Sequence, residues 1–261
     1  MNNLTTNVIG KCNIDCDFCF EELDGSEQEL TKVISDIKSG TSKKEEFDVV
    51  EVGGGETFMY QSLLDLLIEI EGLGKEAHLS TNATFIPKGF LDLEETVRDN
   101  TIVQTSLHAS NPELYKEITG ADFFYKVIDN INKIKEKYNT IISTAVYQKN
   151  FHDVKNIINL SYELELPIRI TLVSATGKGK NVELLEPKQV HQLRSIMLEE
   201  KIKNYDKIDS PLLHQNTCYA IAEAYGIKKI GLCPVDAESK VYVNPRGEKF
   251  ACEFFKQEMR E

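Results

Sequence analysis

Three cysteines near the start of the chain are spaced closely enough to bind one metal centre. Cys12, Cys16 and Cys19 form a C-x3-C-x2-C pattern in the segment CNIDCDFCF. A closed structural zinc site needs four ligands, and this segment offers three thiolates with no fourth ligand nearby. Thiolates suit iron–sulfur clusters, copper(I) or zinc. We expect a cluster with one open iron; the alternatives are a zinc knuckle that borrows a distant ligand, or three unrelated thiols.

The cysteine loop resembles the cluster-binding loop of the radical S-adenosylmethionine (radical SAM) superfamily. Phe18 fits this resemblance, because the family prefers an aromatic residue just before the third cysteine. A GGGET segment further along is similar to the Gly-Gly-Glu motif of the same family. The resemblance implies that the methionyl amino group of SAM is held by Gly54, Gly55 and Glu56, with Thr57 adjacent. The alternative is a glycine turn with an exposed glutamate.

Other residues at strand ends are further candidates for contacts with SAM. Ser80 and Asn82 have short polar side chains that suit a ribose or a carboxylate, although both residue types are also common in turns. Leu172 would pack on the adenine ring, with ordinary core packing as the alternative. The remaining candidates for contacts with SAM are Ser106 and Tyr147, whereas His108 would touch the substrate; each has a structural role as its alternative.

These residues must be positioned by alternating strands and helices. Strand patterns cover residues 5–9, 47–52, 77–80, 102–107, 140–147 and 167–173, and helical patterns cover 27–38, 61–70, 123–138 and 153–165. Such alternation predicts βαβ units with a parallel sheet, and ligands bind at the carboxyl ends of its strands. We predict an α/β fold, a partial (β/α)6 TIM-like barrel over residues 1–205; a doubly wound sheet is the alternative.

The tail carries a second group of three cysteines, Cys218, Cys233 and Cys252. Alternating valines flank an Asn-Pro-Arg-Gly turn at 244–247, which predicts a β-hairpin between the last two cysteines. A hairpin returns the chain beside its own start, so it brings Cys233 and Cys252 together. We expect a small C-terminal hairpin/helix domain over residues 206–261.

The spacing C-x13-G-x4-C resembles the start of the SPASM domain, and the shorter twitch domain, of radical SAM maturases. The resemblance implies a second, auxiliary [4Fe-4S] cluster, with Cys218 as its third ligand. The fourth position would be an open iron, or a side chain such as His214 or Asp236. A full two-cluster SPASM domain is not expected, because the chain stops at Glu261. Reduced thiols or a zinc site are the alternatives.

Composition argues against some classes of partner. The chain has 261 residues, a formal net charge of −12 and a sequence pI of about 5.0. An acidic protein lacks the electrostatic footprint for nucleic acids and for anionic membranes, so we expect neither as a partner. The sequence starts without a signal peptide and contains no membrane-length apolar stretch, so a cytoplasmic location is expected.

The resemblance implies a radical SAM enzyme. Such an enzyme reductively cleaves SAM to a 5′-deoxyadenosyl radical, which takes a hydrogen atom from a substrate. We favour maturation of a ribosomal peptide by crosslinking or oxidation, with a small-molecule dehydrogenase or cofactor-biosynthesis enzyme as the alternative. The chain begins at its first strand, so a peptide would need a separate leader-recognition protein or would bind unaided; flavodoxin or ferredoxin would donate electrons. A non-catalytic iron–sulfur or zinc protein is the alternative from another class.

Overall fold

The computed structural model describes residues 3–21, 23–39, 47–203, 208–209, 225 and 240–250. The predicted auxiliary ligands Cys218, Cys233 and Cys252 lie outside the described residues, as do His214 and Asp236. The same is true of most of the segment predicted to form a second domain. The predicted domain division at residues 205/206 therefore stays a prediction.

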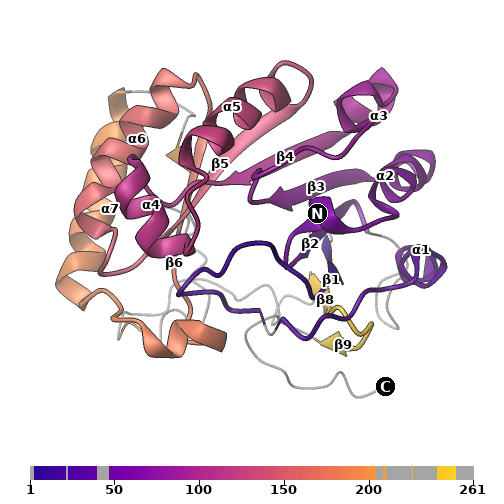
Figure 1. The fold of residues 1–261 in the computed structure, drawn as a ribbon, viewed down its shortest axis with the longest axis horizontal. Helices are drawn as coiled ribbons and strands as arrows, with labels where there is room; N and C mark the ends of the chain where they lie inside the picture. The colour runs from indigo at the N-terminus through magenta and orange to yellow at the C-terminus, as the bar shows by residue number, and fades with distance from the viewer. Residues whose placement is uncertain are drawn as a thin grey trace.

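One curved, mostly parallel sheet organises the described part of the chain (Figure 1). Its strands follow the order β7-β6-β5-β4-β3-β2-β1-β8-β9, and every neighbouring pair is parallel except β8 and β9. The bounds are β1 Asn3–Ile9, β2 Val49–Gly54, β3 Glu76–Thr81, β4 Thr101–Ser106, β5 Asn139–Val146, β6 Ile168–Leu172, β7 Ile208–Asp209, β8 Lys240–Val243 and β9 Lys249–Phe250. The first six strands stand in sequence order, so the predicted α/β partial barrel is confirmed.

Helices follow the strands and lie along the outer side of the curved sheet, while the segment after β1 crosses its open side (Figure 1). Their bounds are α1 Leu30–Ser39, α2 Leu63–Gly72, α3 Glu95–Asp99, α4 Pro112–Thr119, α5 Phe124–Lys135, α6 Val154–Glu163 and α7 Pro187–Lys203. Short 3-10 turns span Thr57–Met59, Phe90–Asp92, Phe151–Asp153 and Gly177–Asn181. Within the described residues, no helix has the length and apolar character needed to cross a membrane.

One helix that the sequence prediction missed is α4, although its start carries a recognisable signal. The Asn111 side chain accepts a hydrogen bond from the Leu114 backbone N–H at 3.0 Å, and Pro112 occupies the first helical turn. This is the usual preference for Asn at the N-cap and Pro just inside a helix. The helix ends at Gly120, which has a left-handed φ of 69°.

Burial alternates along the strands, which separates the two faces of the sheet. Side chains such as Val50, Leu79 and Val103 are fully buried beneath the helices. The alternate positions are polar and partly exposed, as at Ser80 and Gln104. Apolar burial on the outer face stabilises the fold by about 25 cal/mol per Å². The inner face is therefore the face that can receive ligands.

The predicted C-terminal hairpin is present, but its position was not foreseen. Strand β8 pairs in parallel with β1, with Leu4 opposite Val241 and Thr6 opposite Val243. Both valines belong to the same buried core as Leu4. The hairpin thus extends the barrel sheet beyond its first strand. Sequence periodicity could predict the hairpin, because its contacts are local, but not its pairing with a strand more than 200 residues away.

Candidate active site

The cysteine loop, which we define as residues 10–21, leaves the carboxyl end of β1 and is anchored to α4. The backbone N–H groups of Asp15 and Asp17 donate to the carbonyl oxygens of Thr119 and Ile118, both at 3.0 Å. These carbonyls lie at the end of a helix, where they lack helical partners. The loop is therefore held in place by backbone contacts on both sides of its second cysteine.

The segment after β6 holds the opposite side of the cysteine loop. The Lys178 backbone N–H donates to the Cys19 carbonyl oxygen at 2.8 Å, and its ammonium group pairs with Asp15. Gly177 has a left-handed φ of 54°, and a Cβ there would lie 2.6 Å from the Cys19 carbonyl oxygen. The sequence did not reveal this contact, because Lys178 and Asp15 are 163 residues apart.

The aromatic rings of Phe18, His108 and Tyr147 pack together at the cysteine loop. The Phe18 ring packs edge-on to His108 with centroids 4.8 Å apart, and it lies 5.4 Å from the Tyr147 ring. Tyr147 donates its hydroxyl hydrogen to Asp17 Oδ1 at 2.6 Å. Burial lowers the His108 pKa to about 4, against the opposing influence of Asp17, so this histidine is neutral at pH 7. Phe18, which belongs to the loop, thus contacts both His108 and Tyr147.

The three cysteines are partly buried free thiols. Burial raises the pKa of all three, and at Cys16 the neighbouring Cys19 and Cys12 thiols raise it further. Among the described residues, no three His, Cys, Asp or Glu side chains are arranged to hold a single metal ion. An iron–sulfur cluster binds its thiolates through different irons, so it does not need them to converge on one atom. A cationic cluster would displace the thiol protons that burial otherwise retains, so this donor set fits a cluster.

The glycine motif after β2 packs directly on the start of the cysteine loop. The Gly55 N–H donates to the Ile9 carbonyl oxygen, and the Glu56 N–H donates to the Lys11 carbonyl oxygen, both at 2.7 Å. A Cβ at Gly55 would lie 2.5 Å from the Lys11 carbonyl carbon, and Gly54 has a positive φ of 139°. Side chains are therefore excluded here because two backbone segments touch.

Glu56 lies at the centre of a buried network, so the alternative of a glycine turn with an exposed glutamate is wrong. Its side chain is 1% exposed. Oε1 accepts from the Phe58 N–H at 2.9 Å and the Thr81 hydroxyl at 2.5 Å, and Oε2 accepts from the Asn82 N–H at 2.7 Å. Burial raises the Glu56 pKa to about 7, although these three hydrogen bonds oppose the shift. The carboxylate thus joins the ends of β2 and β3.

Asn82 contacts the cysteine loop itself. Its Nδ2 lies 3.7 Å from Cys12 Sγ and donates to Asn13 Oδ1 at 2.9 Å. Its Oδ1 accepts from the Thr84 hydroxyl at 2.7 Å, and Thr84 also accepts from Asn13. An amide N–H directed at a ligand sulfur is a typical outer contact of an iron–sulfur site. The sequence drew attention to Asn82, but it carried no signal for Asn13 or Thr84.

The structure brings some predicted site residues together and leaves others apart from the loop. Thr57 is buried and donates its hydroxyl hydrogen to the Ser80 carbonyl oxygen, which forms a second link between the ends of β2 and β3 beside the Glu56 network. Ser106 lies at the end of β4, partly exposed. Leu172 ends β6 and is 7% exposed within the core. Their predicted contacts with SAM stay predictions.

Comparison with known proteins gives a family match over most of this site. The model of the Radical SAM superfamily matches residues 6–161. A probable GTP 3′,8-cyclase of Sulfurisphaera tokodaii is 28% identical over 216 residues, covering 78% of this chain and 68% of the relative. A GTP 3′,8-cyclase of Clostridium perfringens is 25% identical, covering 95% of this chain and 79% of the relative.

Solved structures share the fold at lower identity. Streptococcus suis SuiB, bound to the precursor peptide SuiA, aligns with a TM-score of 0.78 at 15% identity. The alignment covers 98% of this chain but 61% of SuiB. The protein anSMEcpe with bound AdoMet aligns with a TM-score of 0.69 at 17% identity, over 98% of this chain and 75% of that protein.

Proposed function

The chain belongs to the radical SAM superfamily, and from this premise we propose that Cys12, Cys16 and Cys19 hold a [4Fe-4S] cluster that binds SAM. The observation that carries this proposal is the direct contact of the Gly-Gly-Glu motif with the cysteine loop, through the hydrogen bond from the Glu56 backbone N–H to the Lys11 carbonyl oxygen. When bound, the cluster and SAM supply a 5′-deoxyadenosyl radical that removes a hydrogen atom from the substrate.

The residues of the chain then position SAM. We assign the methionyl amino group to Gly54, Gly55 and Glu56, as the family resemblance implies. Since the Glu56 carboxylate already accepts three hydrogen bonds, it acts in large part by fixing the ends of β2 and β3. Phe18 of the cysteine loop packs on the Tyr147 ring, and this contact helps to fix the loop.

For the substrate we propose a peptide that is crosslinked or oxidised. The neighbours SuiB and anSMEcpe were both solved with peptides bound, and they share this fold over 98% of the chain.

A second candidate is a small-molecule reaction of cofactor biosynthesis. The GTP 3′,8-cyclases support this candidate, because one of them aligns with 95% of the chain at 25% identity. The two candidates are separated by supplying GTP, or a peptide encoded beside the gene, to the reduced enzyme with SAM. Consumption of GTP with formation of a cyclised nucleotide would favour the cyclase; a mass change of the peptide would favour maturation.

We further propose that Cys218, Cys233 and Cys252 bind an auxiliary cluster in a domain over residues 206–261. The hairpin that separates the last two is present, which supports their approach. On this proposal, Cys252→Ala retains SAM cleavage but loses product, because the first cluster remains intact. If Cys252→Ala forms the normal amount of product, the auxiliary cluster has no role in the mechanism.

The proposed partners follow from this chemistry. A flavodoxin or ferredoxin in the cytoplasm would reduce the first cluster, and a separate protein would recognise the leader of a peptide substrate. SuiB, a structural neighbour, was solved with a precursor peptide, which supports a peptide partner. Reduction by flavodoxin in place of dithionite is the direct test of the donor.

The proposed function is tested by SAM cleavage in the anaerobically reconstituted protein. Cys16→Ala should abolish formation of 5′-deoxyadenosine, because one cluster ligand is lost. Ser161→Ala, a truncation of a fully buried serine on α6, is the matched control and should retain cleavage. Equal cleavage by the Cys16→Ala variant and the wild type would contradict the proposal.

A further inference from the structure

The C-terminal hairpin reaches the cysteine loop through a partly buried polar contact. Tyr242 on β8 lies beside Thr5 on β1, and its hydroxyl accepts from Asn7 Nδ2 at 3.1 Å. The same hydroxyl donates to Glu21 Oε1 at 3.2 Å, and Asn7 also donates to that oxygen. Tyr242 and Asn7 are each 3% exposed. The Glu21 carboxylate is therefore held between the first strand of the barrel and the hairpin.

Glu21 lies two residues after the third cysteine. Its carbonyl oxygen is 3.9 Å from Cys19 Sγ, and one residue separates the two in the sequence. A displacement of the Glu21 backbone thus moves the atoms that place this sulfur. The hairpin, through Tyr242, contacts the last part of the loop that carries the cluster ligands.

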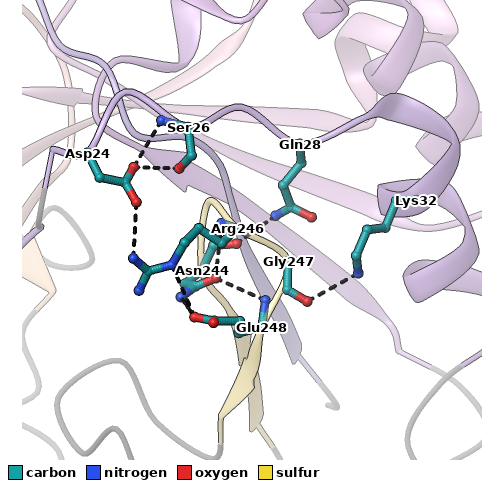
Figure 2. A network of polar contacts seen from close by, with 8 residues as sticks. All are labelled: Asp24, Ser26, Gln28, Lys32, Asn244, Arg246, Gly247 and Glu248. Atoms are coloured by element: carbon teal, nitrogen blue, oxygen red, sulfur yellow. Dashed lines mark hydrogen bonds and ion pairs between the residues drawn. The ribbon is translucent and has the colours of Figure 1, made fainter.

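The turn of the hairpin makes a second set of contacts, with the segment that leads from the cysteine loop into α1 (Figure 2). The contacts are Gln28 Nε2 to the Asn244 carbonyl oxygen at 3.0 Å, Lys32 Nζ to the Gly247 carbonyl oxygen at 3.1 Å, and Arg246 to Asp24 Oδ2 at 3.4 Å. The first of these is buried, whereas the other two are exposed. Exposed ion pairs contribute little by themselves, but together they fix the direction of the segment.

The turn is also stabilised by hydrogen bonds within itself. Asn244 Oδ1 accepts from the backbone N–H groups of Arg246 and Glu248 at 3.0 and 2.9 Å, and Asn244 Nδ2 donates to Glu248 at 2.6 Å. Figure 2 shows these side chains gathered at the tip of the hairpin, facing Asp24 and Gln28. A preformed turn loses less conformational entropy on docking. The hairpin is therefore suited to fix the position of the segment that leads into α1.

We propose that Glu21 is a positioning residue of the first cluster site, and that Tyr242 of the C-terminal hairpin holds it in place. The inference rests on the proposed function, because the positioned ligand is Cys19 of a SAM-binding cluster. It goes beyond that function by giving the hairpin a role in SAM cleavage itself, independent of any auxiliary cluster. The family model ends at residue 161, so the hairpin lies outside the matched region.

The test compares four variants of the full-length, anaerobically reconstituted protein. Glu21→Ala removes the carboxylate, Glu21→Gln retains an acceptor oxygen for Asn7 and Tyr242, and Tyr242→Phe removes one hydroxyl. Tyr138→Phe is the matched control, because Tyr138 is 4% exposed and donates to the Phe90 carbonyl oxygen on another part of the barrel. The readouts are the electron paramagnetic resonance (EPR) signal of the reduced protein with and without SAM, the rate of 5′-deoxyadenosine formation, and thermal unfolding.

We expect Glu21→Ala to alter the SAM-dependent EPR signal and to slow cleavage about tenfold, as for other outer-shell partners of metal ligands. Tyr242→Phe should change the EPR signal and the cleavage rate in the same direction as Glu21→Ala, by a smaller factor. Glu21→Gln should have a cleavage rate close to that of the wild type. Tyr138→Phe should change neither. If Glu21→Ala does not fold, the EPR signals and cleavage rates of Tyr242→Phe and Glu21→Gln are compared with those of the wild type and Tyr138→Phe instead.

Two results would overturn the inference. Wild-type signals and rates in Glu21→Ala and Tyr242→Phe, with unfolding temperatures lowered as in Tyr138→Phe, would make the contact purely structural. A wild-type protein without any SAM-dependent signal would overturn the proposed function as well, since no cluster would remain to be positioned. The two failures are distinguished by the wild-type measurement alone.

Discussion

Substitution of Gly55 by alanine should displace the cysteine loop. The new Cβ would overlap the Lys11 carbonyl oxygen and lie 2.5 Å from its carbon, whereas ordinary contact begins at 3.4 Å. The loop must therefore move by about 1 Å next to Cys12. Overpacking costs about 1–3 kcal/mol. Losing the hydrogen bonds from Gly55 to Ile9 and from Glu56 to Lys11 costs about 1 kcal/mol each.

The expected loss of about 3–5 kcal/mol corresponds to a fall in unfolding temperature of roughly 10 °C for a chain of this size. Gly72→Ala is the matched control, because Gly72 ends α2 and no atom lies within 4 Å of its added Cβ. Alanine is favoured over glycine in helices by about 1 kcal/mol, so the control should be as stable as the wild type or more stable. Thermal unfolding followed by circular dichroism, with iron content per chain, measures both effects. A Gly55→Ala protein that keeps the wild-type unfolding temperature and iron content would refute the close packing of the motif on the loop.

Two further predictions concern the polar network around the loop. Asn82→Ala removes the contact with Cys12 Sγ and should slow 5′-deoxyadenosine formation about tenfold, whereas Asn100→Ala, at the opposite end of the sheet, should not; equal rates would contradict the role of Asn82. Burial raises the Glu56 pKa from 4.5 to about 7, so the folded state binds more protons than the unfolded chain between these pH values. The free energy of unfolding should fall by about 3 kcal/mol as pH rises from 4.5 to 7. Urea unfolding should lose this component in Glu56→Gln, and an identical pH dependence in the variant would exclude Glu56 as its source.

The sequence could predict those features of the site that depend on local spacing. Three cysteines within eight residues, and three glycines before Glu56, identify the loop and its partner motif without any knowledge of the fold. The alternation of strands and helices placed both at the carboxyl ends of β1 and β2. Each of these predictions rests on neighbours in the chain.

The contacts that hold the site together could not be predicted, because they depend on register. The bond between Thr81 and Glu56 requires the pairing of β2 with β3, and no spacing rule distinguishes Thr81 from its neighbours Ser80 and Asn82. Similarly, the contact of Tyr242 with Glu21 requires β8 to lie beside β1. Non-local pairing thus decides which polar residues support the cysteine loop.

The most direct test of the account is iron and sulfide quantification of the anaerobically reconstituted protein, with EPR after reduction and again after addition of SAM. We predict about eight irons per chain and one cluster signal that SAM alters. This signal should be absent from Cys16→Ala. About four irons per chain with the same SAM-dependent signal would support the first cluster and contradict the proposal of an auxiliary cluster. Zinc in place of iron, or a signal that SAM leaves unchanged, would contradict the central claim that Cys12, Cys16 and Cys19 hold a SAM-binding cluster.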